Sequence, residues 1–329
     1  MNRWLRRIGT VLAGIGAVAA AGWLYLHRAV HPGSLEHPRG FPTARLPILA
    51  AAVRAMPVID MRPPLPDGVV EQTNVVYGTG GGRPLHLDLC SPAKIDRPAP
   101  AVLFIHGGAW RTGKRQDYRI YTTHFAKLGY VTATASYRLF REAPYPAAVQ
   151  DVKCAVRWLR ANAARLHIDP ERIAVAGGSA GGHLSMLVGY APGLHEGDGG
   201  HAEVSSKVAA VVDIYGPADL TTPVGRKASV VKDFLGGKSY DEAPALWQEA
   251  SPITHLRAGA PPTLILHGTL DEVVPIGQSD LLAARLKELG VPAEYERIDG
   301  WPHVMDASLP VNEYFKARIA RFLEDRLRR

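Results

Sequence analysis

Short apolar runs alternate with amphipathic stretches over most of the chain. The continuous apolar runs predict buried strands at 101–105, 130–135, 173–176, 208–215 and 263–266. Apolar residues that recur every three or four positions predict helices at 118–128, 147–163, 276–289 and 312–327, and a last strand is expected at 294–298. This alternation predicts an α/β protein with a mostly parallel, doubly wound sheet that carries helices on both faces.

Two further apolar runs come before this alternation. Residues 69–77 and 85–90 flank the glycine-rich turn Gly78–Gly82, so they predict an N-terminal antiparallel hairpin. Closer to the N-terminus, prolines are dense between residues 31 and 68. This density predicts a semi-rigid linker that is interrupted by one short apolar helix at 46–56. The sequence leaves two positions open for this helix, on the membrane or over the domain.

The domain that follows the linker is expected to cover residues 69–329, which is long enough to bury one large core. The pattern is weak between residues 217 and 260, where Phe234, Leu235 and Trp247 stand among polar side chains. We interpret this stretch as a small lid. The chain shows no internal repeats and no low-complexity segments.

An uncharged apolar segment occupies residues 8–26. As a helix it would span about 28 Å, close to the hydrocarbon thickness of a bilayer. Arg3, Arg6 and Arg7 precede it, and positive charges favour the inner side of a membrane. We therefore expect residues 1–30 to anchor the protein in the cell membrane, with the domain exported to the periplasmic or extracellular side.

A cleaved signal peptide is the alternative interpretation of the same segment. Ala17-Val18-Ala19 has the small residues of a cleavage site, and cutting there would release a secreted protein. The apolar run is longer than the usual core of a signal peptide, which favours the anchor. In both cases the domain leaves the cytoplasm.

The net charge and the cysteine content do not alter the predicted fold class. The net charge of +7 comes largely from arginines near the two ends, and no basic segment interleaved with aromatic residues indicates nucleic-acid binding. Cys90 is expected to end a strand and Cys154 to lie in a helix, which predicts two buried thiols rather than a disulfide. No zinc-like spacing of cysteine and histidine occurs, so we expect no metal and no cofactor.

The turn after the strand at 173–176 has the pattern G-x-S-x-G, with Ser179 at its centre. A strand, a tight turn and a helix around this pattern are typical of a nucleophile elbow, in which a strained turn exposes the serine hydroxyl. Side chains at Gly177 and Gly181 would collide with neighbouring backbone. The helix that follows would direct the Ala180 amide toward negative charge forming beside the serine.

A second loop follows the strand at 101–105. The adjacent glycines Gly107 and Gly108 free backbone N–H groups to point into a cavity, so with Ala180 they are the predicted oxyanion hole. His106 precedes the elbow in the chain, and we interpret it as a brace for this loop rather than as a base.

The side chains that would activate the serine follow two further strands. Asp271 follows the strand at 263–266, and His303 follows the strand at 294–298. The order Ser179, Asp271, His303 is that of a serine hydrolase triad, in which the histidine takes the serine proton and the aspartate orients the histidine. The other acids considered for this role are Glu272, Asp299 and Asp306.

Three aromatic residues lie on loops at the same edge of the predicted sheet. Trp110 follows the oxyanion loop, Tyr137 follows the strand at 130–135, and Trp301 lies two residues before His303. Aromatic side chains supply large apolar area at little entropic cost, so we expect these three to wall the acyl or alcohol pocket.

From residue 69 onward the chain resembles the α/β-hydrolase superfamily, in its branch of acetyl-esterase and feruloyl-esterase-like proteins. The motifs that carry the resemblance are His106-Gly-Gly-Ala-Trp110, Gly177-Gly-Ser-Ala-Gly-Gly-His183, His267-Gly-Thr-Leu-Asp271, Gly300-Trp-Pro-His303 and the helix at 146–158. The chain departs from the pattern at Ala109, where many relatives have glycine, and at Gly178, where an acid is common in the hormone-sensitive-lipase-like branch.

The resemblance implies an α/β-hydrolase fold and a serine carboxylic-ester hydrolase that acts on small esters through an acyl-enzyme. Arylformamidases share the same motifs, so an amidase with this machinery is an alternative. An inactive hydrolase scaffold used for binding is another. The sequence leaves the natural substrate open.

Overall fold

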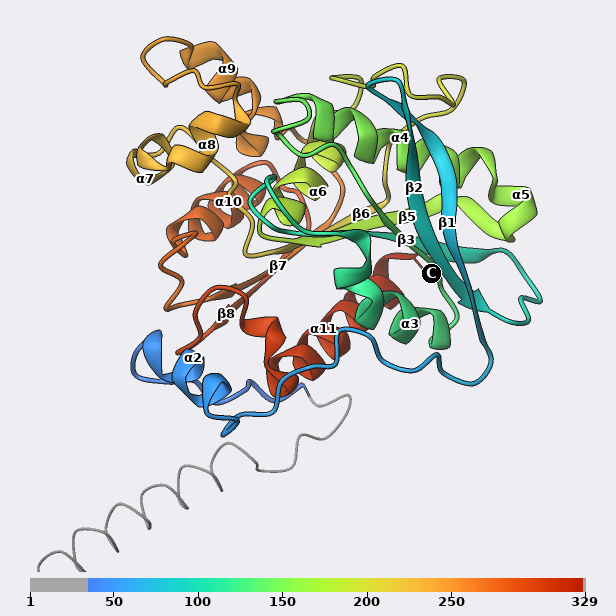
Figure 1. The fold of residues 1–329 in the computed structure, drawn as a ribbon, viewed down its shortest axis with the longest axis horizontal. Coiled ribbons are helices and arrows are strands. Elements are labelled where there is room, and N and C mark those ends of the chain that lie inside the picture. Colours follow the sequence, from blue (N-terminus) through green and yellow to red (C-terminus); the bar gives the residue numbers. More distant parts are fainter. Residues whose placement is uncertain (1–34, 328–329) are drawn as a thin grey trace, which may run out of the picture.

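The computed structural model describes residues 35–327. One eight-stranded sheet runs through it in the order β1-β2-β4-β3-β5-β6-β7-β8 (Figure 1). The strands are β1 Val69–Gly80, β2 Arg83–Pro92, β3 Ala99–Ile105, β4 Val131–Ala135, β5 Ile168–Gly178, β6 Ala210–Ile214, β7 Thr263–Gly268 and β8 Ala293–Ile298. Strand β2 pairs antiparallel with β1 and β4, and all other neighbours are parallel. The predicted hairpin and doubly wound sheet are therefore confirmed.

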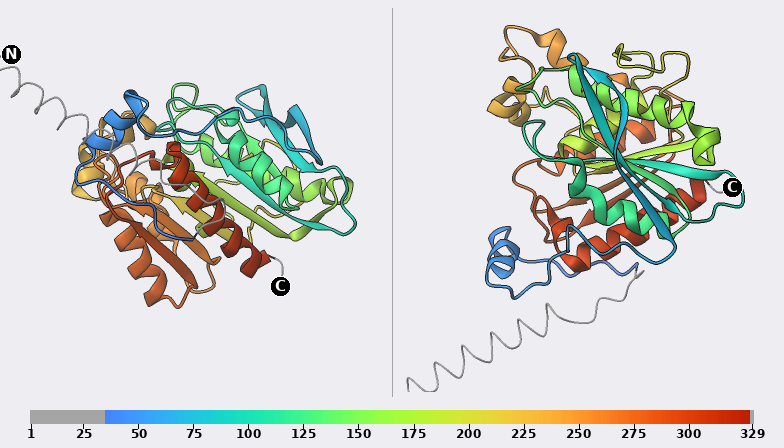
Figure 2. Two further views of the ribbon diagram at one scale, coloured as in Figure 1. Left: turned by 90° about the horizontal axis from the view of Figure 1, so that it is seen from below. Right: turned by 45° about the vertical axis from the view of Figure 1, so that its right-hand side comes forward.

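Helices fill the connections and cover both faces of the sheet (Figures 1 and 2). The α-helices are α2 Arg45–Ala52, α3 Arg119–Lys127, α4 Ala147–Ala161, α5 Ala163–Leu166, α6 Ala180–Tyr190, α7 Pro223–Lys227, α8 Ser229–Phe234, α9 Pro244–Glu249, α10 Gly277–Glu288 and α11 Leu309–Leu327. Short 3-10 turns are η1 Arg115–Tyr118, η2 Pro252–His255 and η3 Met305–Ala307.

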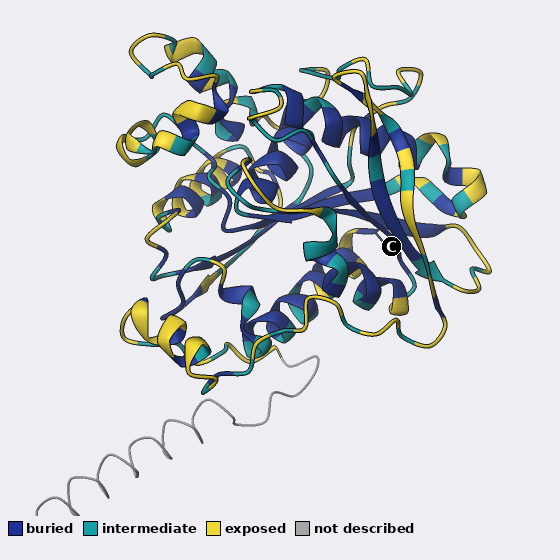
Figure 3. Cartoon of the chain, in the orientation of Figure 1, coloured by how far each residue is buried: buried dark blue, intermediate teal, exposed yellow. Residues whose placement is uncertain are grey.

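Alternate residues of the central strands build two separate cores. Leu103 and Ile105 of β3 face the core beneath α4, α6 and α10, whereas Val102 and Phe104 face the core beneath α3 and α11. All seven residues of β3 are buried, as expected for a parallel strand covered on both faces (Figure 3). This arrangement brings the carboxyl ends of β3, β5, β6, β7 and β8 to one edge of the sheet.

The described part of the proline-rich segment packs on the domain. The Phe41 amide donates to the Gly300 carbonyl at 2.8 Å, and the Ile59 amide donates to the Ala307 carbonyl at 3.0 Å. A Cβ at Gly40 would stand 1.9 Å from the Asp299 carbonyl oxygen, so the contact requires glycine. The segment thus lies against the loop between β8 and α11, and its helix ends at Ala52 rather than at residue 56.

No helix within residues 35–327 has the length and apolar character needed to cross a membrane. The anchor predicted at residues 8–26 lies outside the described part of the chain. Both cysteines, Cys90 and Cys154, are buried as free thiols.

Candidate active site

Ser179 lies in the turn between β5 and α6 with φ 55° and ψ −119°. This strained backbone is held by its amide, which donates to the Ile214 carbonyl at 2.8 Å. The turn is as tight as the sequence indicates. A Cβ at Gly181 would stand 2.0 Å from the Ile105 carbonyl oxygen, and one at Gly177 would stand 2.5 Å from the Gly181 backbone. Glycine is therefore required at both positions.

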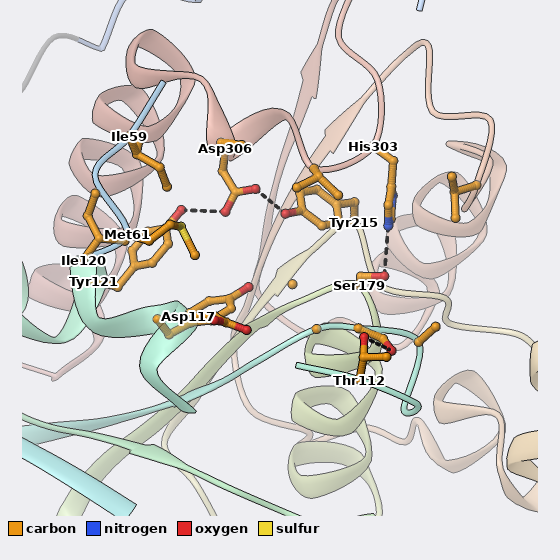
Figure 4. Close-up of a pocket in the computed structure, with 18 of the residues that line it drawn as sticks. Ile59, Met61, Thr112, Asp117, Ile120, Tyr121, Ser179, Tyr215, His303 and Asp306 are labelled. Carbon is orange, nitrogen blue, oxygen red and sulfur yellow. Dashed lines mark hydrogen bonds between the residues drawn. The ribbon is translucent and has the colours of Figure 1, made fainter. Parts of the chain in front are cut away.

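The structure brings Ser179, His303 and Asp271 together from three different loops at the carboxyl edge of the sheet (Figure 4 shows Ser179 and His303). His303 Nδ1 lies 2.6 Å from Asp271 Oδ2, and His303 Nε2 lies 2.9 Å from Ser179 Oγ. A carboxylate only accepts, so Nδ1 donates to it, and Nε2 is left to accept the serine proton.

Asp271 is buried yet held ionised. Burial alone would raise the pKa of its carboxyl, but hydrogen bonds from His267 and His303 outweigh that effect and lower the pKa to about 2. The other carboxylate oxygen, Oδ1, accepts from the amides of Val273 and Val274 at 2.9 and 2.8 Å. Asp271 is therefore a fixed negative charge behind His303 over the whole working pH range.

The other acids considered for this role have different surroundings. Asp299 Oδ1 accepts from the Thr269 hydroxyl at 3.0 Å, and the Asp306 carboxylate accepts from two tyrosine hydroxyls. Glu272 is exposed. Within the described residues, Asp271 is the carboxylate hydrogen-bonded to His303.

From the sequence, His267 is expected to be a packed, hydrogen-bonded group beside the site, and the structure shows it as a second histidine on Asp271. Its Nδ1 lies 2.7 Å from Ser279 Oγ, and its Nε2 lies 2.8 Å from the Val274 carbonyl and 3.2 Å from Asp271 Oδ2. Because a carbonyl only accepts, Nε2 carries the proton and Nδ1 accepts from the Ser279 hydroxyl. The place of His267 at the end of β7, four residues before Asp271, was the available signal.

We expect His267→Phe to reduce kcat about tenfold, because Asp271 loses a hydrogen bond to its charged form. An Asp271 carboxylate with one donor fewer attracts the proton of His303 more strongly, so the acid limb of the kcat profile, which reports protonation of this base, should move to higher pH. His267→Gln, which can keep an N–H donor there, should restore much of the rate. Ser279→Ala is the matched control because it leaves Asp271 its donor. An unmoved acid limb in a folded His267→Phe variant would contradict this positioning role.

The predicted oxyanion loop lies directly against the elbow. A Cβ at Gly107 would stand 3.5 Å from the Ser179 Cβ and 2.8 Å from the Gly178 carbonyl oxygen. Gly107 and Gly108 line the same cavity as Ser179, and Ala180 begins α6 beside it. Ala109 has φ 54°, a left-handed conformation that accounts for glycine being common there.

His106 packs against this loop and stabilises it. Its ring stacks on Tyr137 with centroids 4.3 Å apart, and its Nδ1 lies 2.8 Å from the Gly107 carbonyl. Burial lowers the pKa of His106, so the ring is neutral. Its position agrees with the interpretation as a brace.

A cavity of about 460 Å³ opens beside Ser179 (Figure 4). Its aromatic walls are Tyr118, Tyr121 and Tyr215, and its apolar walls include Ile59 and Met61. The last two come from the proline-rich segment, which hydrogen-bonds to the loop around η3. The segment expected to be a linker therefore forms part of the candidate pocket.

In the close-up, Asp306 lies between Tyr215, on the side of His303, and Tyr121 on the other side (Figure 4). Its carboxylate accepts from the hydroxyls of Tyr215 and Tyr121, the latter at 3.0 Å. Burial raises the pKa of Asp306 even though these hydrogen bonds oppose the shift. The mostly apolar wall of the cavity thus includes one hydrogen-bonded carboxyl group.

The three aromatic residues expected to wall the pocket are placed elsewhere. Trp110, Tyr137 and Trp301 are buried, and none of them lines the cavity beside Ser179. Trp110 stacks on Phe234 at 4.4 Å, the Tyr137 hydroxyl donates to the His106 carbonyl at 2.9 Å, and Trp301 packs edge-on against Phe41. These side chains pack in the core beneath their loops, so they support the loops of the site but do not line the cavity.

The stretch predicted as a lid, residues 217–260, forms α7, α8 and α9. Among the described residues that line the cavity, none comes from this stretch. It packs on the domain through Phe234, whose ring lies 4.4 Å from Trp110 and 5.7 Å from His183. His183 accepts from Trp110 Nε1 at 3.3 Å, and burial lowers the pKa of His183 to about 4.

These positions lead to a prediction about chain length. On p-nitrophenyl esters from acetate to octanoate, the parent rate should fall beyond about butyrate, since the side chains that line the cavity limit its volume to about 460 Å³. Met61→Ala should shift the preference to longer chains because Met61 lines the cavity. Trp301→Ala should lower the melting temperature but keep the parent profile. A shift with Trp301→Ala and none with Met61→Ala would show that the acyl chain binds elsewhere.

Comparisons with known proteins agree with this geometry. The model of the BD-FAE family matches residues 87–286. Probable carboxylic ester hydrolase LipM of Mycobacterium tuberculosis (strain ATCC 25618 / H37Rv) is 32% identical over 241 residues, which is 71% of this chain and 56% of LipM. The chain thus spans little more than half the length of this curated relative.

Two solved structures cover most of the chain. A truncated carbohydrate esterase from gut microbiota has a TM-score of 0.69 and 28% identity, covering 82% of this chain and 100% of that one. Esterase 2 of the Planctomycetes species Thermogutta terrifontis has a TM-score of 0.68 and 29% identity, covering 81% and 95%. The same esterase has been solved with propionate bound and phosphonylated by sarin.

Proposed function

The chain belongs to the BD-FAE family of α/β-hydrolase esterases, and we propose on this premise that it is a serine hydrolase of short-chain or aryl carboxylic esters. The observation that carries the proposal is the continuous hydrogen-bonded row Ser179–His303–Asp271 at the wall of an apolar cavity. A serine hydroxyl is a weak nucleophile by itself, and this row supplies the base and the fixed charge that activate it.

In the proposed reaction, Ser179 Oγ attacks the ester carbonyl carbon while its proton passes to His303 Nε2. The carbonyl oxygen becomes an oxyanion beside the amides of Gly107, Gly108 and Ala180. When the tetrahedral intermediate collapses, the C–O bond to the alcohol breaks and the imidazolium protonates the leaving alkoxide. Water then loses a proton to His303 and attacks the acyl carbon. The bond from this carbon to Ser179 Oγ breaks, the imidazolium returns its proton to Oγ, and the carboxylic acid leaves.

The substrate class is proposed from the size and chemistry of the cavity. A volume of about 460 Å³ with mostly apolar walls suits a small acyl group or an aromatic ring. Bound propionate in the esterase of Thermogutta terrifontis is consistent with short acyl groups.

The test has two arms. A fluorophosphonate probe should label the wild-type protein, because only an activated serine reacts. A panel of p-nitrophenyl esters beside N-formylkynurenine then separates an esterase from an arylformamidase-type amidase. Labelling together with ester turnover supports the proposal. Labelling with preferential N-formylkynurenine hydrolysis supports the amidase, and a protein that does not label is an inactive scaffold.

We also propose that residues 8–26 anchor the enzyme in the cell membrane with its catalytic domain exported. The support is the sequence alone: 19 uncharged residues preceded by three arginines. After a carbonate wash, membranes should retain the full-length protein, and added protease should reach the domain. Recovery of a soluble protein whose first residue is near Ala20 would show a cleaved signal peptide instead.

A further inference from the structure

The outward side of α2 is apolar. Leu46, Ile48, Leu49 and Val53, which follows the helix, are exposed by 40%, 64%, 56% and 63%. We call these four residues the outer face of α2. The helix buries Pro47 and Ala50 on its other side. A surface helix normally carries polar residues on its outward side, so the exposed apolar side chains indicate a binding partner for this face.

The chain that leaves α2 leads directly to the candidate active site. The chain that leaves α2 pairs with the η3 region, since Val58 bridges Ser308 and the Leu309 amide donates to the Pro57 carbonyl at 2.9 Å. It then supplies Ile59 and Met61 to the cavity. In Figure 3, α2 stands at the outside of the molecule with exposed residues on most of its surface.

Apolar residues also surround the cavity mouth. Val273 and Val304 line the cavity and are 66% and 54% exposed, and Met61 is 41% exposed. Val273 comes from the loop of Asp271, and Val304 directly follows His303. Apolar side chains are therefore exposed both on α2 and on the loops that carry the candidate catalytic residues.

The chain before α2 indicates what covers this surface. Only 18 residues, 27–44, separate the uncharged segment 8–26 from Arg45, where α2 begins. An extended chain of that length reaches at most about 60 Å, so α2 stays near any membrane that holds the segment. Arg45 and Arg54 stand at the two ends of the apolar stretch, and both are exposed. Basic residues flanking an apolar face favour an anionic lipid surface.

We propose that the outer face of α2 lies in the headgroup region of the lipid bilayer, so that the cavity mouth faces the membrane and takes up esters dissolved in it. This inference rests on the esterase activity and the anchor proposed above. Bilayer-dissolved esters have an apolar alcohol part, which the rim residues Met61, Val273 and Val304 can receive. The catalytic steps are unchanged.

The position of α2 is measured first, with the full-length chain in vesicles of phosphatidylcholine and phosphatidylglycerol. Ile48→Cys is labelled with the fluorophore NBD, and Cys90 and Cys154 stay unlabelled because they are buried. Leu281→Cys on α10, 48% exposed in the parent, is the matched control. Emission at position 48 should shift to the blue and be quenched by nitroxide-bearing lipids, whereas position 281 should respond as in water.

Three results would overturn the proposal. Water-like emission at position 48 would show that the outer face is not covered. A blue shift that nitroxide lipids do not quench would indicate that residues 1–34 fold over it. A blue shift that grows with the protein-to-lipid ratio would indicate a second copy of the chain.

The consequence for activity is measured with two substrates. Ile48→Glu combined with Leu49→Glu should reduce hydrolysis of vesicle-dissolved hexadecyl acetate about tenfold, the effect of losing part of the burial of two large apolar side chains. Hydrolysis of water-soluble p-nitrophenyl acetate should be unchanged, and Val224→Glu combined with Leu281→Glu should affect neither. Equal losses on both substrates would contradict the membrane role. A parent that hydrolyses neither ester would refute the esterase, while the NBD measurement still decides where α2 lies.

Discussion

Ser179→Ala is expected to reduce kcat by about 10⁴-fold or more, because no other group can form the acyl-enzyme. The fold should survive the change. Alanine keeps the Cβ that the strained backbone at φ 55° already accommodates, and the amide bond to the Ile214 carbonyl is independent of the side chain. The measurement is turnover of p-nitrophenyl acetate together with the melting temperature and fluorophosphonate labelling.

Ser185→Ala is the matched control for this variant. Ser185 lies on the same helix, α6, and is buried, and its hydroxyl donates to the Gly181 carbonyl at 2.8 Å instead of to His303. It should keep nearly the full rate and full labelling. A Ser179→Ala variant that retains more than a few per cent of the parent activity would remove Ser179 from the mechanism.

Asp271→Asn is expected to reduce kcat by about 10⁴-fold while the protein stays folded. The amides of Val273 and Val274 both donate to Oδ1, so the asparagine oxygen would be kept there and the NH2 group would face His303. His303 Nδ1 would then have to accept, and its proton would move to Nε2. A histidine in this tautomer cannot take the Ser179 proton, and no negative charge would stabilise the imidazolium.

Asp299→Asn is the control for Asp271→Asn. Asp299 lies on the loop between β8 and His303, but its Oδ1 accepts from the Thr269 hydroxyl at 3.0 Å. Its neutralisation should therefore leave kcat within a small factor of the parent. Equal or greater loss in Asp299→Asn would mean that the wrong carboxylate has been assigned. Circular dichroism on both variants separates loss of chemistry from loss of fold.

The two variants together test whether the groups act as one unit. If Ser179, His303 and Asp271 form a single catalytic device, the effects of Ser179→Ala and Asp271→Asn should not add in the double variant. The rate that remains should be about that of Ser179→Ala alone. Additive losses would place Asp271 in a separate role, such as structural support of the loop.

Local patterns in the sequence are enough to predict the sheet and the edge at which the catalytic side chains lie. Apolar runs and helical periodicity are local properties, and a buried parallel strand such as β3 needs an uninterrupted apolar run whatever its neighbours are. The need for glycine around Ser179 could also be predicted from the sequence, because the turn between β5 and α6 leaves no room for a Cβ at Gly177 or Gly181. The order of Ser179, Asp271 and His303 along the chain predicted that these side chains come together, and they lie together in the structure.

Which side chains line the cavity depends on the tertiary structure. Trp110, Tyr137 and Trp301 follow strand ends as expected, but the direction of each side chain depends on partners far away in the chain, such as Phe234 and Phe41. The walls come instead from η1, from the end of β6 and from a proline-rich segment that packs through backbone hydrogen bonds. Backbone hydrogen bonds between distant segments leave no pattern in side-chain hydropathy. The hydrogen bond from His267 to Asp271 and the exposed apolar side of α2 also become visible only once the chain is folded, because each depends on where the side chains lie.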